Sequence, residues 1–186
     1  LKFDGSYHGH NDNLLANIFS SSEVDGILFS VASEVLIARF NDFDSVDKLF
    51  ELHGHNIACV IIEPILANIN LVLPNYDFLL KLRNICDKYN SLLIFDEIVT
   101  GFRVCLSGAQ GKYNIYPDLT CMGKIVGGGF PIGVLGGKKE IMVHLSPIGT
   151  VYHGGTMAGN PITMRAGYET IKYCLNNLYL YNILER

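Results

Sequence analysis

Two apolar runs that each end in an acidic residue most constrain the fold of this chain. Residues 57–62 read IACVII and are followed by Glu63, and residues 92–95 read LLIF and are followed by Asp96. Runs without polar alternation are typical of strands that are buried on both faces, as in parallel sheets. The sequence therefore predicts two parallel strands with a carboxylate at the end of each.

The segment between these runs predicts a helix. Asn75 or Asp77 is placed to cap it. The apolar residues that follow recur at helical spacing: Phe78, Leu79, Leu82, Ile85, Cys86 and Tyr89. Because a strand, a helix and a strand in this order form the right-handed crossover unit of an α/β sheet, we expect an α/β fold with a mostly parallel sheet flanked by helices.

Shorter patterns predict further elements. They are strands at residues 118–122 and 132–135, a helix at 44–52 capped by Asp44 or Ser45, and a helix at 161–175 after a Gly-Asn-Pro turn. No linker divides the chain, so residues 1–186 are expected to form a single partial domain. Both ends read as though inside an element, which favours a chain truncated at both ends.

Composition argues against several classes of function. A formal net charge of −4 gives no basic field for a polyphosphate, so nucleic-acid binding is not expected. The most apolar window is broken by Glu63 and Pro64 well short of the roughly 20 residues that span a bilayer. The five cysteines are odd in number and form no C-x-x-C pair, which favours reduced thiols and a cytoplasmic location.

The histidine pairs do not predict a metal site. Two His-Gly-His stretches occur, one with His8 and His10 and one with His53 and His55. Neither has cysteine or carboxylate residues at the regular spacing of metal ligands. We therefore expect no bound metal and read His8 as part of a Tyr-His-Gly segment.

Lys124 stands in the stretch CMGKIVGGGFPIG at residues 121–133. The lysine precedes the glycines, which is the reverse of a Walker loop, so nucleoside triphosphate binding is not favoured. A lysine in a dry, glycine-lined pocket can act as a nucleophile through its neutral amine, whereas a solvated lysine on a glycine turn is the plainer alternative.

Three polar residues follow predicted strands and suggest one site. Glu63, Asp96 and Lys124 each lie at a strand end, and ligands of α/β sheets bind beyond the carboxyl ends of the strands. Asp96 could pair with the pyridinium nitrogen of a cofactor and keep that nitrogen protonated, so that the ring can act as an electron sink. The alternative is that Asp96 caps the following turn.

Longer motifs carry a family resemblance. The segments FDEIVTGFR at residues 95–103, Pro117-Asp118 and GKIVGGGFPIG at 123–133 resemble the signature of class III pyridoxal-phosphate-dependent aminotransferases of fold type I. The resemblance implies the large, cofactor-binding domain of that fold, with pyridoxal 5'-phosphate as the cofactor and its pyridoxamine form in the cycle.

The resemblance also implies roles for individual residues. Lys124 would bind the cofactor covalently and move protons, Asp96 would bind the pyridine nitrogen, and Tyr7 and Ile98 would cover the two faces of the ring. Asn68 would lie near the phenolic oxygen of the cofactor or near the substrate.

Two further roles concern segments nearer the edges of the site. Thr156 would donate to the cofactor phosphate across a homodimer interface, and Ser20 would belong to a mobile loop over the substrate. The loop around Ser20 lacks the small residues usual in the family, and Ala67 stands where the family commonly has glycine before the asparagine.

Other segments are more similar to the aminomutases of this family. They are KFDGSYHGHND at residues 2–12, IIEPILAN at 61–68, LSGAQ at 106–110 and TMAG at 156–159. This likeness implies intramolecular amino transfer that converts glutamate-1-semialdehyde to 5-aminolevulinate in porphyrin biosynthesis. A class III ω-aminotransferase and an inactive remnant remain alternatives. The family's phosphate-gripping loop would precede Leu1, so this polypeptide alone is not expected to be active.

Overall fold

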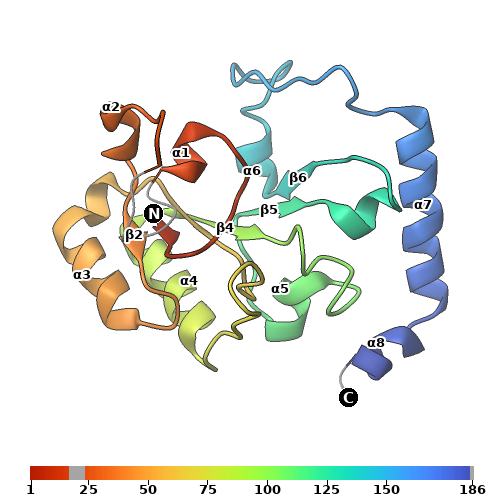
Figure 1. The fold of residues 1–186 in the computed structure, drawn as a ribbon, viewed down its shortest axis with the longest axis horizontal. Helices are drawn as coiled ribbons and strands as arrows, with labels where there is room; N and C mark the ends of the chain where they lie inside the picture. Colours follow the sequence, from red (N-terminus) through yellow and green to blue (C-terminus); the bar gives the residue numbers. More distant parts are fainter. Residues whose placement is uncertain (17–23, 185–186) are drawn as a thin grey trace. The chain divides into compact units, whose positions relative to one another are not determined.

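The computed structural model describes residues 1–16 and 24–184 (Figure 1). Contacts divide the chain into two compact units, Leu1–Asp96 and Glu97–Arg186. Helices alternate with strands along the chain, and the predicted α/β class is confirmed. The single partial domain expected from the sequence stays a prediction.

The strands of the first unit pair in parallel. β1 (Lys2–Phe3) pairs with β2 (Ile37–Ala38), and β3 (Cys59–Ile62) pairs with β4 (Leu92–Asp96). The two apolar runs thus form neighbouring parallel strands, as predicted. Because the register places Ile62 beside Phe95, the residues that follow them, Glu63 and Asp96, come at the same level of the sheet.

Helix α4 (Phe78–Tyr89) connects β3 to β4 and confirms the predicted crossover. Five of the six residues predicted to form its apolar face are buried: Phe78, Leu79, Leu82, Ile85 and Cys86. The helix ends at Asn90, whose backbone is left-handed with φ 58°, a conformation that asparagine tolerates. Ser91 then donates from Oγ to the backbone oxygen of Ile57 at 2.6 Å and ties the start of β4 to β3.

Helix α3 (Phe43–His53) begins earlier than the sequence predicted. The cap is Asp42, not Asp44 or Ser45, and its carboxylate accepts from the backbone N–H of Ser45 at 3.0 Å. Arg39 also donates to Asp42, from Nε at 2.7 Å. The Ser45 N–H, and then Arg39, hold the pKa of Asp42 below its usual value. The prediction was wrong because apolar Phe43 occupies the first helical position, which hides the start of the helix.

Several short elements of the first unit had no prediction. Besides β1 and β2 they are α1 (Asp12–Leu15), α2 (Phe29–Ala32) and the 3-10 turn η1 (Gly54–Asn56). Elements of two to four residues are too short to show a period, so only tertiary contacts specify them.

The second unit contains one antiparallel pair of strands. β5 (Leu119–Met122) pairs with β6 (Val134–Gly137), with Leu119 opposite Gly137 and Met122 opposite Val134. The strand predicted at residues 132–135 therefore begins two residues later, because pairing with β5 starts at Val134. Short helices accompany the pair: α5 (Gly108–Tyr113), η2 (Lys124–Gly127), α6 (Lys139–Met142) and α8 (Tyr179–Leu184).

Helix α7 (Pro161–Asn176) is the long helix of the second unit and confirms the helix predicted at residues 161–175 (Figure 1). Asn160 caps it by accepting from the backbone N–H groups of Ile162 at 3.1 Å and Thr163 at 3.3 Å. Gly167 lets the helix approach η2 closely, since a Cβ there would lie 2.3 Å from the backbone oxygen of Val126. This close packing holds the turn that begins with Lys124 against α7.

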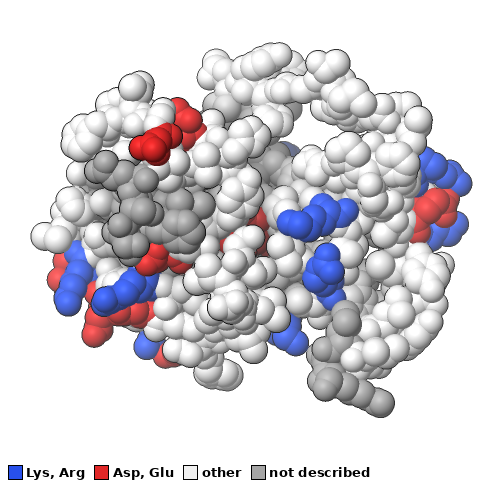
Figure 2. All heavy atoms as spheres, in the orientation of Figure 1, with Lys and Arg blue, Asp and Glu red and all other residues white. Residues whose placement is uncertain are grey.

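Charged side chains are mixed on the visible surface. Figure 2 shows basic and acidic groups side by side over α3 and along α7. On α7 the pair is Arg165 with Glu169 at 2.6 Å, and just before α3 it is Arg39 with Asp42 at 2.6 Å. No helix in the described part of the chain is long and apolar enough to cross a membrane.

Lys2 on β1 is a buried cation, with 1% of its surface exposed. Its Nζ donates to the backbone oxygen of Leu14. Burial disfavours the charged ammonium and lowers the pKa of Lys2 from 10.5 to about 8. The folded chain therefore releases this proton near pH 8, whereas the unfolded chain keeps it until about pH 10.5.

Lys2 is expected to make the free energy of unfolding rise between pH 8 and 10.5, because the unfolded state binds more protons than the folded state in this window. Replacing Lys2 with methionine should remove this rise. Denaturant unfolding on both sides of the window measures it, with Lys48→Met, an exposed position on α3, as the control. An unchanged pH dependence in Lys2→Met would contradict the assignment.

Candidate active site

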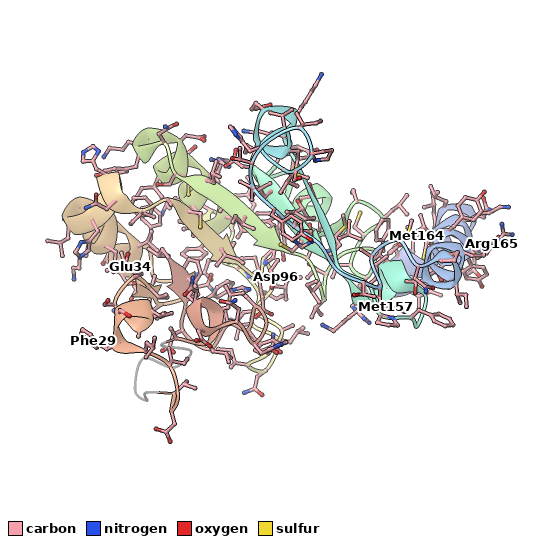
Figure 3. All side chains as sticks on the ribbon, turned by 90° about the horizontal axis from the view of Figure 1, so that it is seen from above. Phe29, Glu34, Asp96, Met157, Met164 and Arg165 are labelled. Carbon is pink, nitrogen blue, oxygen red and sulfur yellow. The ribbon has the colours of Figure 1, made fainter. Side chains whose placement is uncertain are left out.

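Asp96 ends β4 and is 7% exposed (Figure 3). Its Oδ2 lies 2.7 Å from Nδ1 of His8, whose side chain is fully buried. A buried carboxylate is costly unless it is hydrogen-bonded, and His8 supplies such a bond. Asp96 thus lies at a strand end as predicted, and its role as a cofactor ligand stays a prediction.

The second ring nitrogen of His8 has no hydrogen-bond partner among the described residues. Nε2 is buried and makes no hydrogen bond within that part of the chain. A carboxylate oxygen accepts, so Nδ1 is assigned as the donor to Asp96. The sequence placed His8 beside Tyr7 but did not predict its bond to Asp96, since the two residues are 88 positions apart.

Glu63 is 3% exposed and its carboxylate is fully engaged. It accepts from the backbone N–H of Tyr7 at 2.9 Å, from that of Ala67 at 3.0 Å, and from Nδ2 of Asn68 at 2.9 and 3.0 Å. The sequence grouped Glu63 with the ligand-binding residues. The structure gives it protein partners, so Glu63 is a support for the site rather than an open ligand.

Two predicted cofactor contacts therefore lie together in the first unit. Tyr7 has 45% of its surface exposed, and Asn68 is exposed in a loop closed by the bridge between Leu66 and Val72. Their backbone or side-chain nitrogens meet at Glu63. Glu63 therefore fixes the Asn68 amide and the backbone of Tyr7, while both side chains stay exposed to a ligand.

Lys124 opens the turn η2 directly after β5 and Gly123. Its backbone is left-handed, with φ 48°, a conformation that costs an L-residue about 1–2 kcal/mol. Such strain persists where the surroundings impose it, and it concentrates at functional sites. Here the surroundings are α7, which packs on η2 through Gly167.

The side chain of Lys124 is exposed and lines an open hollow of about 790 Å³. Arg103, Phe130, Ile132 and Thr170 also line it. All the residues that line this hollow belong to the second unit, so the dry pocket expected from the sequence stays a prediction.

Glu97 was missed in the sequence and proves to be completely buried. It accepts from Oγ1 of Thr100 at 2.7 Å and from the backbone N–H groups of Ala109 at 2.6 Å and Gln110 at 2.9 Å. A Cβ at Gly108 would lie 2.5 Å from its Oε2. Glu97 therefore holds the start of α5 against the segment that follows Asp96. The available signal was its place directly after a buried strand.

The remaining predicted residues have different surroundings. Ile98 packs on the turn, since a Cβ at Gly123 would lie 3.0 Å from its Cδ1. Thr156 is exposed in the segment before α7. Ser20 lies outside the described residues. Asp96 and Lys124 belong to different units, so their placement on two sides of one ring stays a prediction.

No metal centre is evident in residues 1–16 and 24–184, where no group of three or more histidine, cysteine, aspartate or glutamate side chains could hold an ion. The groups that the structure offers are a buried carboxylate with its histidine, an exposed amine on a strained turn, and Glu63, which binds the Asn68 amide and the backbone N–H of Tyr7.

Comparison with curated proteins gives close matches over the whole chain. The chain is 54% identical to glutamate-1-semialdehyde 2,1-aminomutase of Wigglesworthia glossinidia brevipalpis, covering 100% of this chain and 44% of that protein. It is 50% identical to the enzyme of the same name from Thermosipho africanus, covering 100% of this chain and 45% of that protein. The chain thus spans less than half the length of these relatives.

Solved structures agree with the fold. An ω-transaminase from Sphaerobacter thermophilus matches with a TM-score of 0.86 and 36% identity, over 93% of this chain and 43% of that one. A transaminase with PLP bound matches with a TM-score of 0.87 and 29% identity, over 92% of this chain and 42% of that one. A sequence model of the family described as aminotransferase class-III matches residues 1–185. This chain belongs to the class III aminotransferases.

Proposed function

We propose that the protein carrying this chain converts glutamate-1-semialdehyde to 5-aminolevulinate by intramolecular amino transfer, an isomerase reaction of porphyrin biosynthesis. The structural observation that carries the proposal is the buried Asp96 with its His8 partner at a strand end. The 54% identity to a relative named for this reaction supports the choice of substrate.

The residues fit pyridoxal 5'-phosphate as the cofactor. A buried carboxylate suits a cationic pyridine nitrogen, since the pair offsets the cost of burying either charge. An exposed amine on a fixed turn suits a carbonyl group, to which a lysine can bind covalently. When bound, this cofactor supplies an electron sink for amino-group chemistry, and its pyridoxamine form carries the amino group.

Each residue then has a stated task. Asp96 would bind the ring nitrogen and keep it protonated, while His8 orients the Asp96 carboxylate. The Lys124 amine would bind the cofactor and move protons at its Nζ. Tyr7 and Ile98 would cover the two faces of the ring.

Asn68 and Thr156 would hold other parts of the ligand. Asn68 would lie near the phenolic oxygen or the substrate, and Thr156 would donate to the phosphate from the neighbouring subunit of a homodimer. The exposure of both residues supports these tasks. Ser20 remains the proposed substrate-loop residue. We place the homodimer in the cytoplasm, in line with the reduced state of the five cysteines.

A class III ω-aminotransferase is the second candidate, because a solved ω-transaminase matches 93% of this chain at 36% identity. The two activities differ in whether a separate amino acceptor is needed. Both depend on Asp96 and Lys124.

The full-length protein is expected to form 5-aminolevulinate from glutamate-1-semialdehyde alone. An intramolecular transfer needs no second substrate, so added 2-oxoglutarate should not raise the rate. Product is measured by mass spectrometry with and without 2-oxoglutarate. Product formation that depends strictly on 2-oxoglutarate would contradict the aminomutase proposal and favour the ω-aminotransferase.

A further inference from the structure

The carboxylate of Glu63 joins two segments that are far apart in the sequence. Oε1 accepts from the backbone N–H of Tyr7, 56 positions away, and Oε2 accepts from that of Ala67. Nδ2 of Asn68 reaches both oxygens. With 3% of its surface exposed, Glu63 has protein donors in place of water.

The chemistry of the partners fixes the orientation of Asn68. An ionised carboxylate can only accept, so the amide nitrogen and not the amide oxygen of Asn68 must face Glu63. This leaves Oδ1 as the acceptor that Asn68 can offer to a ligand. A group bound there has to donate a hydrogen bond.

The strand register links this network to Asp96. Glu63 and Asp96 follow Ile62 and Phe95, which are paired between β3 and β4. Glu63 holds the backbone of Tyr7, and Asp96 holds the ring of the next residue, His8. Two carboxylates at the ends of neighbouring strands therefore fix one dipeptide.

Packing closes the arrangement. Leu66 and Val72 exchange backbone hydrogen bonds of 2.9 Å in both directions and close the loop that carries Asn68. Ile69 of the same loop lies against Gly5, where a Cβ would come within 2.9 Å of its Cδ1. The Asn68 loop and the segment before Tyr7 are thus in contact, with Glu63 bonded to both.

We propose that Glu63 is a positioning residue that sets Tyr7 and Asn68 together for the cofactor, with Asn68 turned so that Oδ1 faces the ligand. This inference rests on the proposed function for the cofactor itself. Glu63 acts through its hydrogen bonds and does not touch the ligand.

The test is a reciprocal exchange of the two side chains in the full-length protein. Glu63→Gln places an amide N–H₂ where acceptors are needed, and Asn68→Asp places a second carboxylate against Glu63. Each single change is expected to weaken pyridoxal phosphate binding on the order of tenfold. In the double variant the amide of Gln at position 63 can donate to the carboxylate of Asp at position 68. We therefore expect the double variant to recover at least half of the sum of the two single losses in cofactor affinity, expressed as free energies.

Two controls match these changes. Glu51→Gln makes the same substitution at an exposed position of α3, and Asn70→Asp makes the same substitution two residues away in the loop. Both should bind the cofactor within about twofold of the unsubstituted protein. If Glu63→Gln does not fold, the difference in cofactor affinity between Asn68→Asp and Asn70→Asp still tests the contact between Asn68 and Glu63.

A second readout needs no cofactor. In the cofactor-free protein, Glu63→Gln should speed hydrogen exchange at the amide of Tyr7 or of Ala67 relative to Glu51→Gln, since glutamine keeps one acceptor oxygen for two amides that now bind one oxygen each. The role of Glu63 would be overturned by unchanged hydrogen-exchange rates in Glu63→Gln. It would also be overturned if the affinity losses of the two single variants were simply additive in the double variant. Absence of cofactor binding in the unsubstituted protein would instead overturn the proposed function, so the two failures are distinguishable.

Discussion

Lys124→Ala in the full-length protein is expected to abolish turnover, with a loss of at least about 10⁴-fold, because in the proposed function one amine both binds the cofactor and moves protons. The visible absorbance band of covalently held pyridoxal phosphate should disappear with it. Reduction with borohydride followed by mass spectrometry should find the cofactor attached to Lys124 in the unsubstituted protein and unattached in the variant.

Lys139→Ala is the matched control, since Lys139 is an exposed lysine of α6 in the same unit. It should keep both the band and the activity. A band that survives Lys124→Ala would contradict the assignment. If the unsubstituted full-length protein shows no band with added pyridoxal phosphate, the inactive remnant would replace either enzyme as the better interpretation.

Asp96→Asn is expected to lower turnover by on the order of 10²–10³-fold while leaving the fold intact. The amide oxygen of asparagine can still accept from Nδ1 of His8, so the 2.7 Å contact has a substitute. What the variant lacks is the negative charge that keeps a pyridine nitrogen protonated. The defect should therefore lie in turnover far more than in stability.

Two measurements separate these effects. Thermal unfolding should change little, and a cofactor analogue methylated on the ring nitrogen, which is permanently cationic, should recover part of the lost activity. Asp44→Asn at an exposed position of α3 serves as the control. Activity of Asp96→Asn equal to that of the control would contradict the role of Asp96.

The fold could be predicted where a local pattern was strong. The apolar runs of β3 and β4 and the helical spacing of α4 each reflect burial on a defined face, which a single sequence records. β1 and β2 span two residues each and exist because they pair with one another. Their specification lies in contacts between distant segments, which no local pattern carries.

The site divides in the same way. The positions of Asp96 and Lys124 could be predicted because Asp96 is the last residue of β4 and Lys124 follows β5 after one glycine, at the strand ends where ligands bind. The hydrogen-bond partners of the site residues could not be predicted from the sequence. His8 reaches Asp96 from 88 positions away, and Glu63 reaches Tyr7 from 56 positions away. Glu97 directly follows the last residue of β4, and its task depends on bonds to Thr100, Ala109 and Gln110, which no local pattern indicates.

The left-handed backbone of Lys124 sets stability and activity in opposition at one position. Glycine adopts a φ of 48° without the steric cost that lysine has there. Lys124→Gly is therefore expected to raise the thermal stability of the protein, and a selection for stability alone would retain it. If Lys124 has the proposed role, the same selection run with a demand for amino transfer would reject this change. A position where stability favours glycine and the sequence keeps lysine is one where we expect function to have selected the residue.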